Sequence, residues 1–214
     1  QQTLAQAEHD LERAFALQPT HLSHYQLTLE PNTVFFARPP QGIPDDDSAW
    51  DMQEHCQRLL AEAGYAQYEV SAYARPGRQS QHNLNYWRFG DYLGIGAGAH
   101  GKISSGAEQH VLRRWKHKHP QTFMDTAGTA ASIGGDEVIG ADRLPFEYML
   151  NLLRLHEGFR FKDFESRTGL DRATIAAPLQ TALAKGWMTV QGDHVQPTEL
   201  GRRFTNDVVE LFLG

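Results

Sequence analysis

The sequence HLSHYQLTL at residues 21–29 determines the fold that we expect for the first part of the chain. Its second half alternates apolar and polar residues at Tyr25, Leu27 and Leu29, which predicts a strand, and Pro31 ends that strand. Functional side chains commonly lie at the carboxyl ends of such strands. The end of this segment is therefore a candidate position for a site.

Segments of helical periodicity lie on both sides of this strand. Thr3 and Gln6 form a capping-box pair, so an opening helix is predicted. The acidic run at residues 45–47 suits the start of a second helix, which ends before Gly64, and a second strand is predicted at 65–73. The alternation of helix and strand is typical of an α/β sheet.

The last third of the chain is predicted to be mostly helical. Gly192 and Asp193 mark a two-stranded hairpin that follows three short helices and precedes a last one, in the order of a winged helix. The preceding stretch from Thr126 to Gly140 is rich in small residues and is predicted to be a linker or a mobile loop. The predicted organisation is an α/β domain over residues 1–125, a linker over 126–140 and a mostly α, winged-helix-like domain over 141–214.

The composition excludes several classes of protein. The chain has 214 residues, with 20 Lys and Arg against 26 Asp and Glu, and this balance argues against nucleic-acid binding by broad phosphate neutralisation. The winged-helix-like part holds nine basic and ten acidic side chains, so it lacks the basic face of a DNA-binding domain. The single cysteine, Cys56, excludes an iron–sulfur cluster held by this chain alone and fits a reducing compartment. No apolar stretch approaches the roughly 20 residues of a membrane span.

The most unusual stretch is His82-Asn83-Leu84-Asn85-Tyr86-Trp87-Arg88-Phe89-Gly90. It is neither cleanly helical nor cleanly alternating. A neutral imidazole is an axial ligand for haem iron, and aromatic faces suit a planar macrocycle, so a haem or porphyrin contact is chemically sensible. The alternative is that the aromatic residues belong to the core and that His82 bonds a backbone carbonyl. The residue chemistry leaves both open.

Two neighbouring features also allow more than one interpretation. The glycine run at residues 94–101 contains His100 and indicates either close approach to a flat ligand or a tight turn after a strand at 92–95. The basic cluster at residues 113–119 could contact nucleic acid or porphyrin propionates, or could be a solvated loop.

These motifs together resemble a known family. The HNLNYW sequence matches the HNxxYW signature of HemW-type haem chaperones, members of the radical S-adenosylmethionine (SAM) group related to oxygen-independent coproporphyrinogen III oxidase. Other segments similar to that family are HLSHYQLTLEPNTVF at 21–35, YEVSAYARPG at 68–77, GDYLGIGAGAHGK at 90–102, RRWKHKHP at 113–120, and FKDFESRTGL and PTELGRRFTNDV near the end.

The resemblance implies a particular fold and origin for the chain. It implies that the chain begins after the family's CxxxCxxC cluster-binding loop, and that the strand at 21–29 is the last of a partial, TIM-like radical SAM barrel. Residues 141–214 would then be the C-terminal helical domain that covers the open side of that barrel.

The resemblance also assigns roles to particular residues. The expected haem or porphyrin contacts are His82, Asn83, Tyr86 and Trp87. The expected SAM contacts, by similarity to the oxidase, are Tyr25, Thr28 and His100. Many relatives have a cysteine before the HN pair, whereas this chain has Gln81, so no thiol role is expected at that position.

The function implied for the intact protein is to bind haem and pass it to haem-accepting proteins, with SAM and a [4Fe-4S] cluster as further cofactors. The alternative is the oxidase activity, in which propionates of coproporphyrinogen III are oxidatively decarboxylated during haem biosynthesis. The chain by itself is expected to be inactive as an enzyme, because the three clustered cysteines are absent. A cytoplasmic location without a membrane-spanning segment is expected, and peripheral membrane association is left open.

Overall fold

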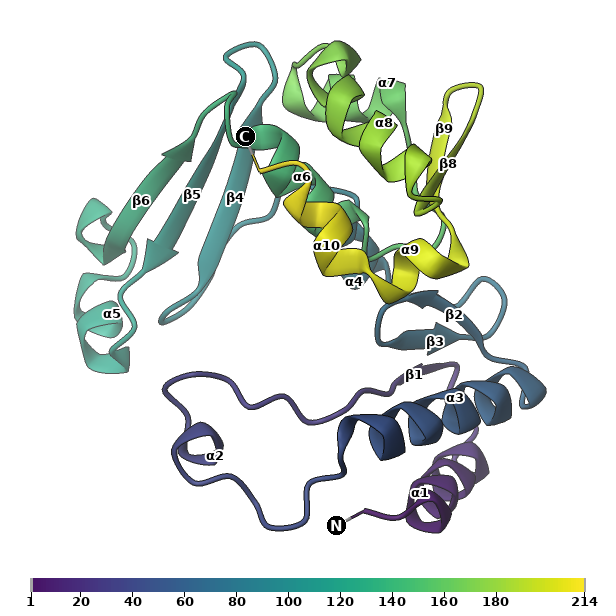
Figure 1. Cartoon of the computed structure of the whole chain (residues 1–214). Helices are drawn as coiled ribbons and strands as arrows, with labels where there is room; N and C mark the ends of the chain where they lie inside the picture. Colours follow the sequence, from purple (N-terminus) through teal and green to yellow (C-terminus); the bar gives the residue numbers. More distant parts are fainter. Residues whose placement is uncertain (1, 214) are drawn as a thin grey trace. The chain divides into compact units, whose positions relative to one another are not determined.

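The computed structural model describes residues 2–213 and divides the chain into two compact units (Figure 1). The first unit ends at Ser80 and the second begins at Gln81. The described residues form three small sheets of three strands each, and all strand pairs in them are antiparallel. The fold is therefore mixed α/β, but its sheets are antiparallel.

The first unit is built on two helices packed against a short sheet. A capping box of Thr3 and Gln6 starts α1, and the Asp45 carboxylate caps α3, so both predicted helix starts are confirmed. Leu11 of α1 and Leu60 of α3 are almost fully buried in one apolar cluster. The elements are α1 (Leu4–Ala16), β1 (His21–Ser23), α2 (Val34–Ala37), α3 (Asp46–Glu62), β2 (Ala66–Glu69) and β3 (Ala72–Ala74), with sheet order β1-β3-β2.

The strand predicted at 21–29 is only three residues long. It pairs with β3 from His21 to Ser23, after which residues 24–30 have no regular structure. Tyr25 and Leu27 are exposed, so no buried face supports the alternation there. The second predicted strand is divided into β2 and β3, which pair with each other through a bulge near Glu69.

The second unit opens with a helix and a sheet. Its first elements are α4 (Gln81–Trp87), β4 (His100–Ser105), β5 (His110–Lys116), α5 (Pro120–Thr126), a 3-10 turn (Ala130–Ser132) and β6 (Ile133–Ile139), with sheet order β4-β5-β6. The predicted strand at 92–95 is reduced to one bridge between Tyr92 and Lys102.

The prediction of a linker over residues 126–140 was wrong. Strand β6 pairs with β5 from Ile139 to Ile133. The small residues that suggested a linker have a packing role, because the indole of Trp115 lies against Gly135, where a Cβ would be 2.7 Å from indole Cε2. The glycine thus makes room for a large neighbour in the sheet.

The rest of the second unit is mostly helical, as predicted for this part. The hairpin at Gly192 is confirmed, and a third short strand, β7, pairs with β9 beside it. The elements are α6 (Leu144–Leu152), β7 (Phe159–Arg160), α7 (Phe161–Thr168), a 3-10 turn (Arg172–Ile175), α8 (Ala176–Ala184), β8 (Met188–Gln191), β9 (His194–Pro197), α9 (Glu199–Arg203) and α10 (Thr205–Glu210).

The core of the first unit makes a direct stability prediction. Leu60→Ala should lower the free energy of unfolding by about 2–4 kcal/mol, because Leu60 is fully buried and its truncation leaves a cavity. Urea unfolding measures this difference. Leu17→Ala is the control, since Leu17 is 84% exposed and its loss should change the stability by less than about 0.5 kcal/mol. Equal effects of the two substitutions would contradict this packing.

Candidate functional site

The HNLNYW stretch forms the helix α4, in contrast to the irregular structure that its pattern suggested. The helix ends in a tight loop, where the Gly90 amide donates to the Asn85 carbonyl at 2.7 Å and Phe89 adopts a left-handed backbone conformation (φ 57°). The Asn85 side-chain amide then donates to the Asp91 carbonyl at 3.1 Å. Asn85 therefore ties the helix to the segment that follows it.

His82 lies on the surface of this helix. Its imidazole is exposed and makes no hydrogen bond within the described part of the chain, so the alternative of a bond to a backbone carbonyl is not observed. The ring meets Tyr86 edge to face, with centroids 4.7 Å apart, and Tyr86 contacts Tyr92 at 4.4 Å. Neither imidazole nitrogen is therefore used by another described residue, while the ring contacts Tyr86 and, through it, Tyr92.

Other residues of the motif are partly buried. Arg154 lies over the ring of Trp87 at 4.4 Å, and the indole nitrogen of Trp87 is buried with no hydrogen-bond partner among the described residues. Asn83 is half-buried and Leu84 is buried. Trp87 and Leu84 therefore anchor the helix, whereas His82 faces solvent.

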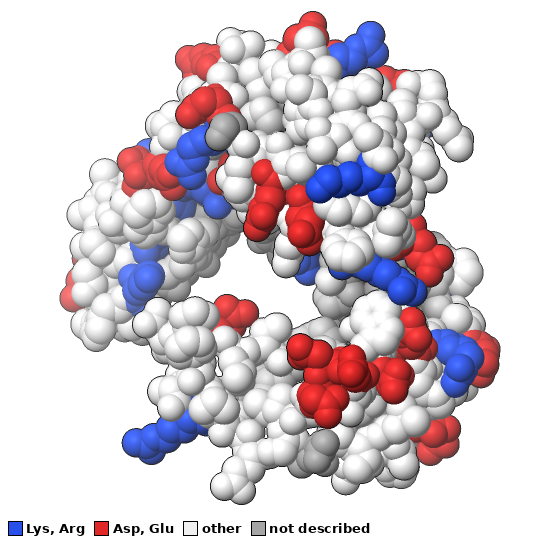
Figure 2. Space-filling model, in the orientation of Figure 1, with Lys and Arg blue, Asp and Glu red and all other residues white. Residues whose placement is uncertain are grey.

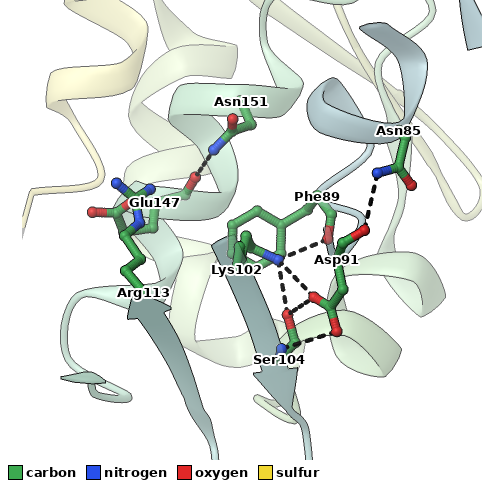
Figure 3. A network of polar contacts seen from close by, with 8 residues as sticks. All are labelled: Asn85, Phe89, Asp91, Lys102, Ser104, Arg113, Glu147 and Asn151. Carbon is green, nitrogen blue, oxygen red and sulfur yellow. Dashed lines mark hydrogen bonds and ion pairs between the residues drawn. The ribbon is translucent and has the colours of Figure 1, made fainter. Parts of the chain in front are cut away.

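A buried lysine holds the end of α4 against the sheet (Figure 3). Lys102 of β4 is 4% exposed, and its ammonium donates to the Phe89 carbonyl at 3.0 Å, the Ser104 hydroxyl at 2.8 Å and the Asp91 carboxylate at 3.2 Å. The same ammonium lies 3.6 Å from the centre of the Phe89 ring. All of the ammonium's donors are satisfied, which is what a buried charge requires.

The electrostatics of this cluster follow from burial and hydrogen bonding. Burial lowers the pKa of Lys102, although the Asp91 carboxylate opposes that change. Burial also acts to raise the pKa of Asp91, but hydrogen bonds from the amide and hydroxyl of Ser104 and the charge of Lys102 outweigh it, and the pKa is lowered. At neutral pH the carboxylate is therefore ionised.

The glycine run forms a tight backbone crossing. A Cβ at Gly94 would lie 2.6 Å from the His100 carbonyl carbon, and one at Gly101 would lie 3.0 Å from the Gly94 amide. Neighbouring backbone thus accounts for these two glycines, as one of the two interpretations expected. Leu93 and Ile95 between them are exposed.

The basic cluster at residues 113–119 begins on strand β5, so the interpretation as a solvated loop was wrong for its first half. Arg113 pairs with the buried carboxylate of Glu147 at 2.5 Å, and Arg114 pairs with Asp136 at 2.9 Å. On the face shown in Figure 2, basic side chains are scattered among acidic and uncharged ones and form no extended basic area. These arginines are therefore neutralised within the fold.

The residues expected to contact SAM lie in both units. In the first unit, Tyr25 is 75% exposed and the Thr28 hydroxyl donates to Glu30 at 3.1 Å, in the irregular segment after β1. In the second unit, the exposed His100 stacks on Trp115, with ring centroids 5.9 Å apart and planes at 27°.

The described residues do not fit an iron–sulfur cluster. Cys56 lies inside the first unit, and burial, with the nearby Glu8 carboxylate, raises the pKa of its thiol. No group of three or more His, Cys, Asp and Glu side chains in residues 2–213 is placed to hold a metal ion. No helix in this part of the chain is long and apolar enough to cross a membrane.

A polar pocket of about 720 Å³ lies within the second unit. Arg88, the residue after the motif, lines it and pairs with Glu157 at 2.7 Å. Arg160 and Arg167 also line this pocket, as do Asp163 and Asp193, so its lining holds as many acidic as basic side chains.

Comparison with known proteins gives consistent matches. Residues 141–204 match the family model of the HemN C-terminal domain. The chain is 48% identical over 212 residues to the heme chaperone HemW of Escherichia coli K12, covering 99% of this chain and 54% of that protein. It is 43% identical over 212 residues to heme chaperone HemW of Haemophilus influenzae, with the same coverage. The chain thus spans about half the length of these curated relatives.

A solved structure shows the same fold. It is the coproporphyrinogen III oxidase HemN from Escherichia coli, described as a radical SAM enzyme. The TM-score is 0.73 at 20% sequence identity, and the match covers 99% of this chain and 52% of that one. At this identity the likeness establishes the fold alone.

The buried lysine leads to a prediction for the stability of the second unit. Lys102→Met should lower the free energy of unfolding by about 2–3 kcal/mol, because it leaves the Asp91 carboxylate without its cation. The loss is smaller than for a fully enclosed pair, since the Asp91 side chain is 43% exposed. Denaturant unfolding measures it. Lys118→Met, at an exposed lysine, is the control and should have little effect.

The lowered pKa of Asp91 predicts a pH dependence. A carboxyl group with a depressed pKa in the folded state stabilises the protein above its unfolded pKa of about 4, and this stabilisation is lost as pH falls through the folded pKa. The difference in unfolding free energy between the parent protein and Asp91→Asn should therefore narrow below about pH 4. A difference that stays constant from pH 7 into the acid range would contradict the assignment.

Proposed function

Because the chain belongs to the HemW-type family, we propose that the whole protein binds haem and delivers it to haem-accepting proteins. The observation that carries this proposal is the exposed imidazole of His82, which has no hydrogen-bond partner among residues 2–213 and contacts the ring of Tyr86. The names of the curated relatives support a haem chaperone more than an oxidase.

In this proposal His82 is an axial ligand of the haem iron. A neutral imidazole donates an electron pair from one ring nitrogen to iron, and that nitrogen must be free of other bonds. The edge contact with Tyr86 limits how the ring can turn without occupying either nitrogen. Haem is the cargo here, and the residues present fit its iron.

The other motif residues would position the haem against His82. Tyr86 and Trp87 would offer aromatic surface to the macrocycle, and Asn83 a polar contact at its edge. Trp87 is also held under Arg154, so its contribution includes fixing the helix.

The intact protein would also use SAM and a [4Fe-4S] cluster. The cluster has no fitting site among the described residues, so its ligands would come from sequence that this chain does not contain. Tyr25, Thr28 and His100 remain our proposed SAM contacts. The first unit would be the end of a partial barrel, residues 141–214 a winged-helix-like cover, and the cytoplasm the compartment.

The axial ligand is tested by haem titration of the full-length protein. His82→Ala should weaken haem binding at least about tenfold and shift the Soret band, because one iron–nitrogen bond is lost. His9→Ala is the control, since His9 is an exposed histidine of α1 in the first unit, outside both the motif and the basic cluster. Identical affinity and spectrum for His82→Ala and the parent protein would remove His82 as the ligand.

A further inference from the structure

Strands β4, β5 and β6 lie side by side in one sheet (Figure 1). His100, Trp115 and Gly135 are neighbours across these three strands. His100 pairs with Trp115, and Trp115 pairs with Gly135, as directly opposite residues in antiparallel register. Opposite residues point to the same face of a sheet. The imidazole and the indole therefore share one face, with an empty side-chain position next to them.

The indole of Trp115 extends over the empty position. A Cβ on Gly135 would be 2.7 Å from indole Cε2 and 3.0 Å from the indole nitrogen, so the ring passes across the strand at this point. Only glycine allows this approach. The Trp115 ring is also stacked with His100, their planes 27° apart. The result is a broad aromatic surface on the sheet.

The same face continues to the motif helix. Tyr92 and Lys102 exchange two backbone hydrogen bonds of 3.0 and 2.9 Å, so they are an opposite pair, and His100 is two residues from Lys102 on the same strand. Side chains two apart on a strand share a face. Tyr92 in turn contacts Tyr86, which supports His82.

His82 is thus connected to this sheet through the ring contacts of Tyr86 and Tyr92, and it differs in chemistry from Trp115. His82 offers an imidazole without a hydrogen bond, whereas the indole of Trp115 offers ring surface and has no hydrogen-bond or ion-pair partner within the described residues. Trp115 is half-buried, whereas Val111, which points to the same face from the same strand, is fully buried. A partly exposed aromatic ring on the face of a sheet suits a flat, apolar ligand.

We propose that Trp115, whose indole packs over Gly135, is a stacking platform for the porphyrin ring. It contributes to the affinity for the macrocycle whether or not the macrocycle holds iron. This inference rests on the proposed haem-binding function. His82 would bind the metal and Trp115 the ring system, so the two contributions separate when the metal is removed.

The test compares haem with metal-free protoporphyrin IX in the full-length protein. Trp115→Ala should weaken binding of both ligands by about tenfold, since aromatic stacking and burial of the ring contribute on the order of 1.4 kcal/mol. Trp115→Phe, which keeps an aromatic face, should stay within about threefold of the parent protein. Trp187→Phe is the matched control, because Trp187 stacks on Phe204 in another part of the unit and should not affect either ligand.

Gly135→Ala supplies a second variant that leaves the indole in the sequence. Its Cβ would displace the ring, so it should weaken metal-free protoporphyrin binding at least about threefold with unchanged circular dichroism. Parent-like affinity for metal-free protoporphyrin in both Trp115→Ala and Gly135→Ala would overturn the platform.

The His82→Ala variant separates the two proposals. If it loses the haem spectrum but keeps its affinity for metal-free protoporphyrin, while Trp115→Ala loses that affinity, both proposals hold. If His82→Ala leaves the haem spectrum unchanged and Trp115→Ala still weakens metal-free protoporphyrin binding, the platform holds and His82 fails as the ligand.

Discussion

The buried ammonium of Lys102 is the interaction on which the arrangement of the candidate site depends. It joins strand β4 to the loop after α4 through the Phe89 carbonyl and the Asp91 carboxylate. A buried cation is costly unless each donor is satisfied, and here three oxygens and the Phe89 ring surround it. This requirement fixes one position for the end of the motif helix.

The fixed helix end explains why an exposed histidine can have a defined geometry. Phe89 adopts a left-handed conformation, which is uncommon for a residue with a side chain, and its carbonyl and its ring both contact Lys102. The helix above this turn carries His82 on its exposed side and Leu84 on its buried side. The lysine, the strained turn and the aromatic contacts therefore act together to hold one imidazole in a defined position on the surface.

The sequence pattern predicted the features that depend on local chemistry. The Thr3 capping box, the acidic start of α3 and the turn at Gly192 are all present, because each is determined by residues within a few positions. The features that depend on distant partners were missed. Lys102 lies inside a strand pattern, and this is the signal that could have indicated a buried polar cluster. Its partner, the Phe89 carbonyl, is a backbone group that no sequence pattern identifies.

The sheet β4-β5-β6 and the surroundings of His82 also depend on residues that are distant in the sequence. Residues 133–139 appeared to be a linker because Gly134 and Gly135 lack side chains, and only the position of Trp115 on the next strand explains the second glycine. His82 was identified from its motif, whereas its exposure and its contact with Tyr86 required the folded structure. Short-range patterns thus identified the candidate ligand, and the structure supplied its surroundings.

Hydrogen exchange of the full-length protein with and without haem tests the central claim, that haem binds where α4 meets the sheet β4-β5-β6. We expect haem to slow amide exchange in residues 81–92 and 100–116 and to leave the hairpin β8-β9 unchanged. The account would be contradicted if haem slowed exchange elsewhere in the chain while both of these segments exchanged as in the free protein.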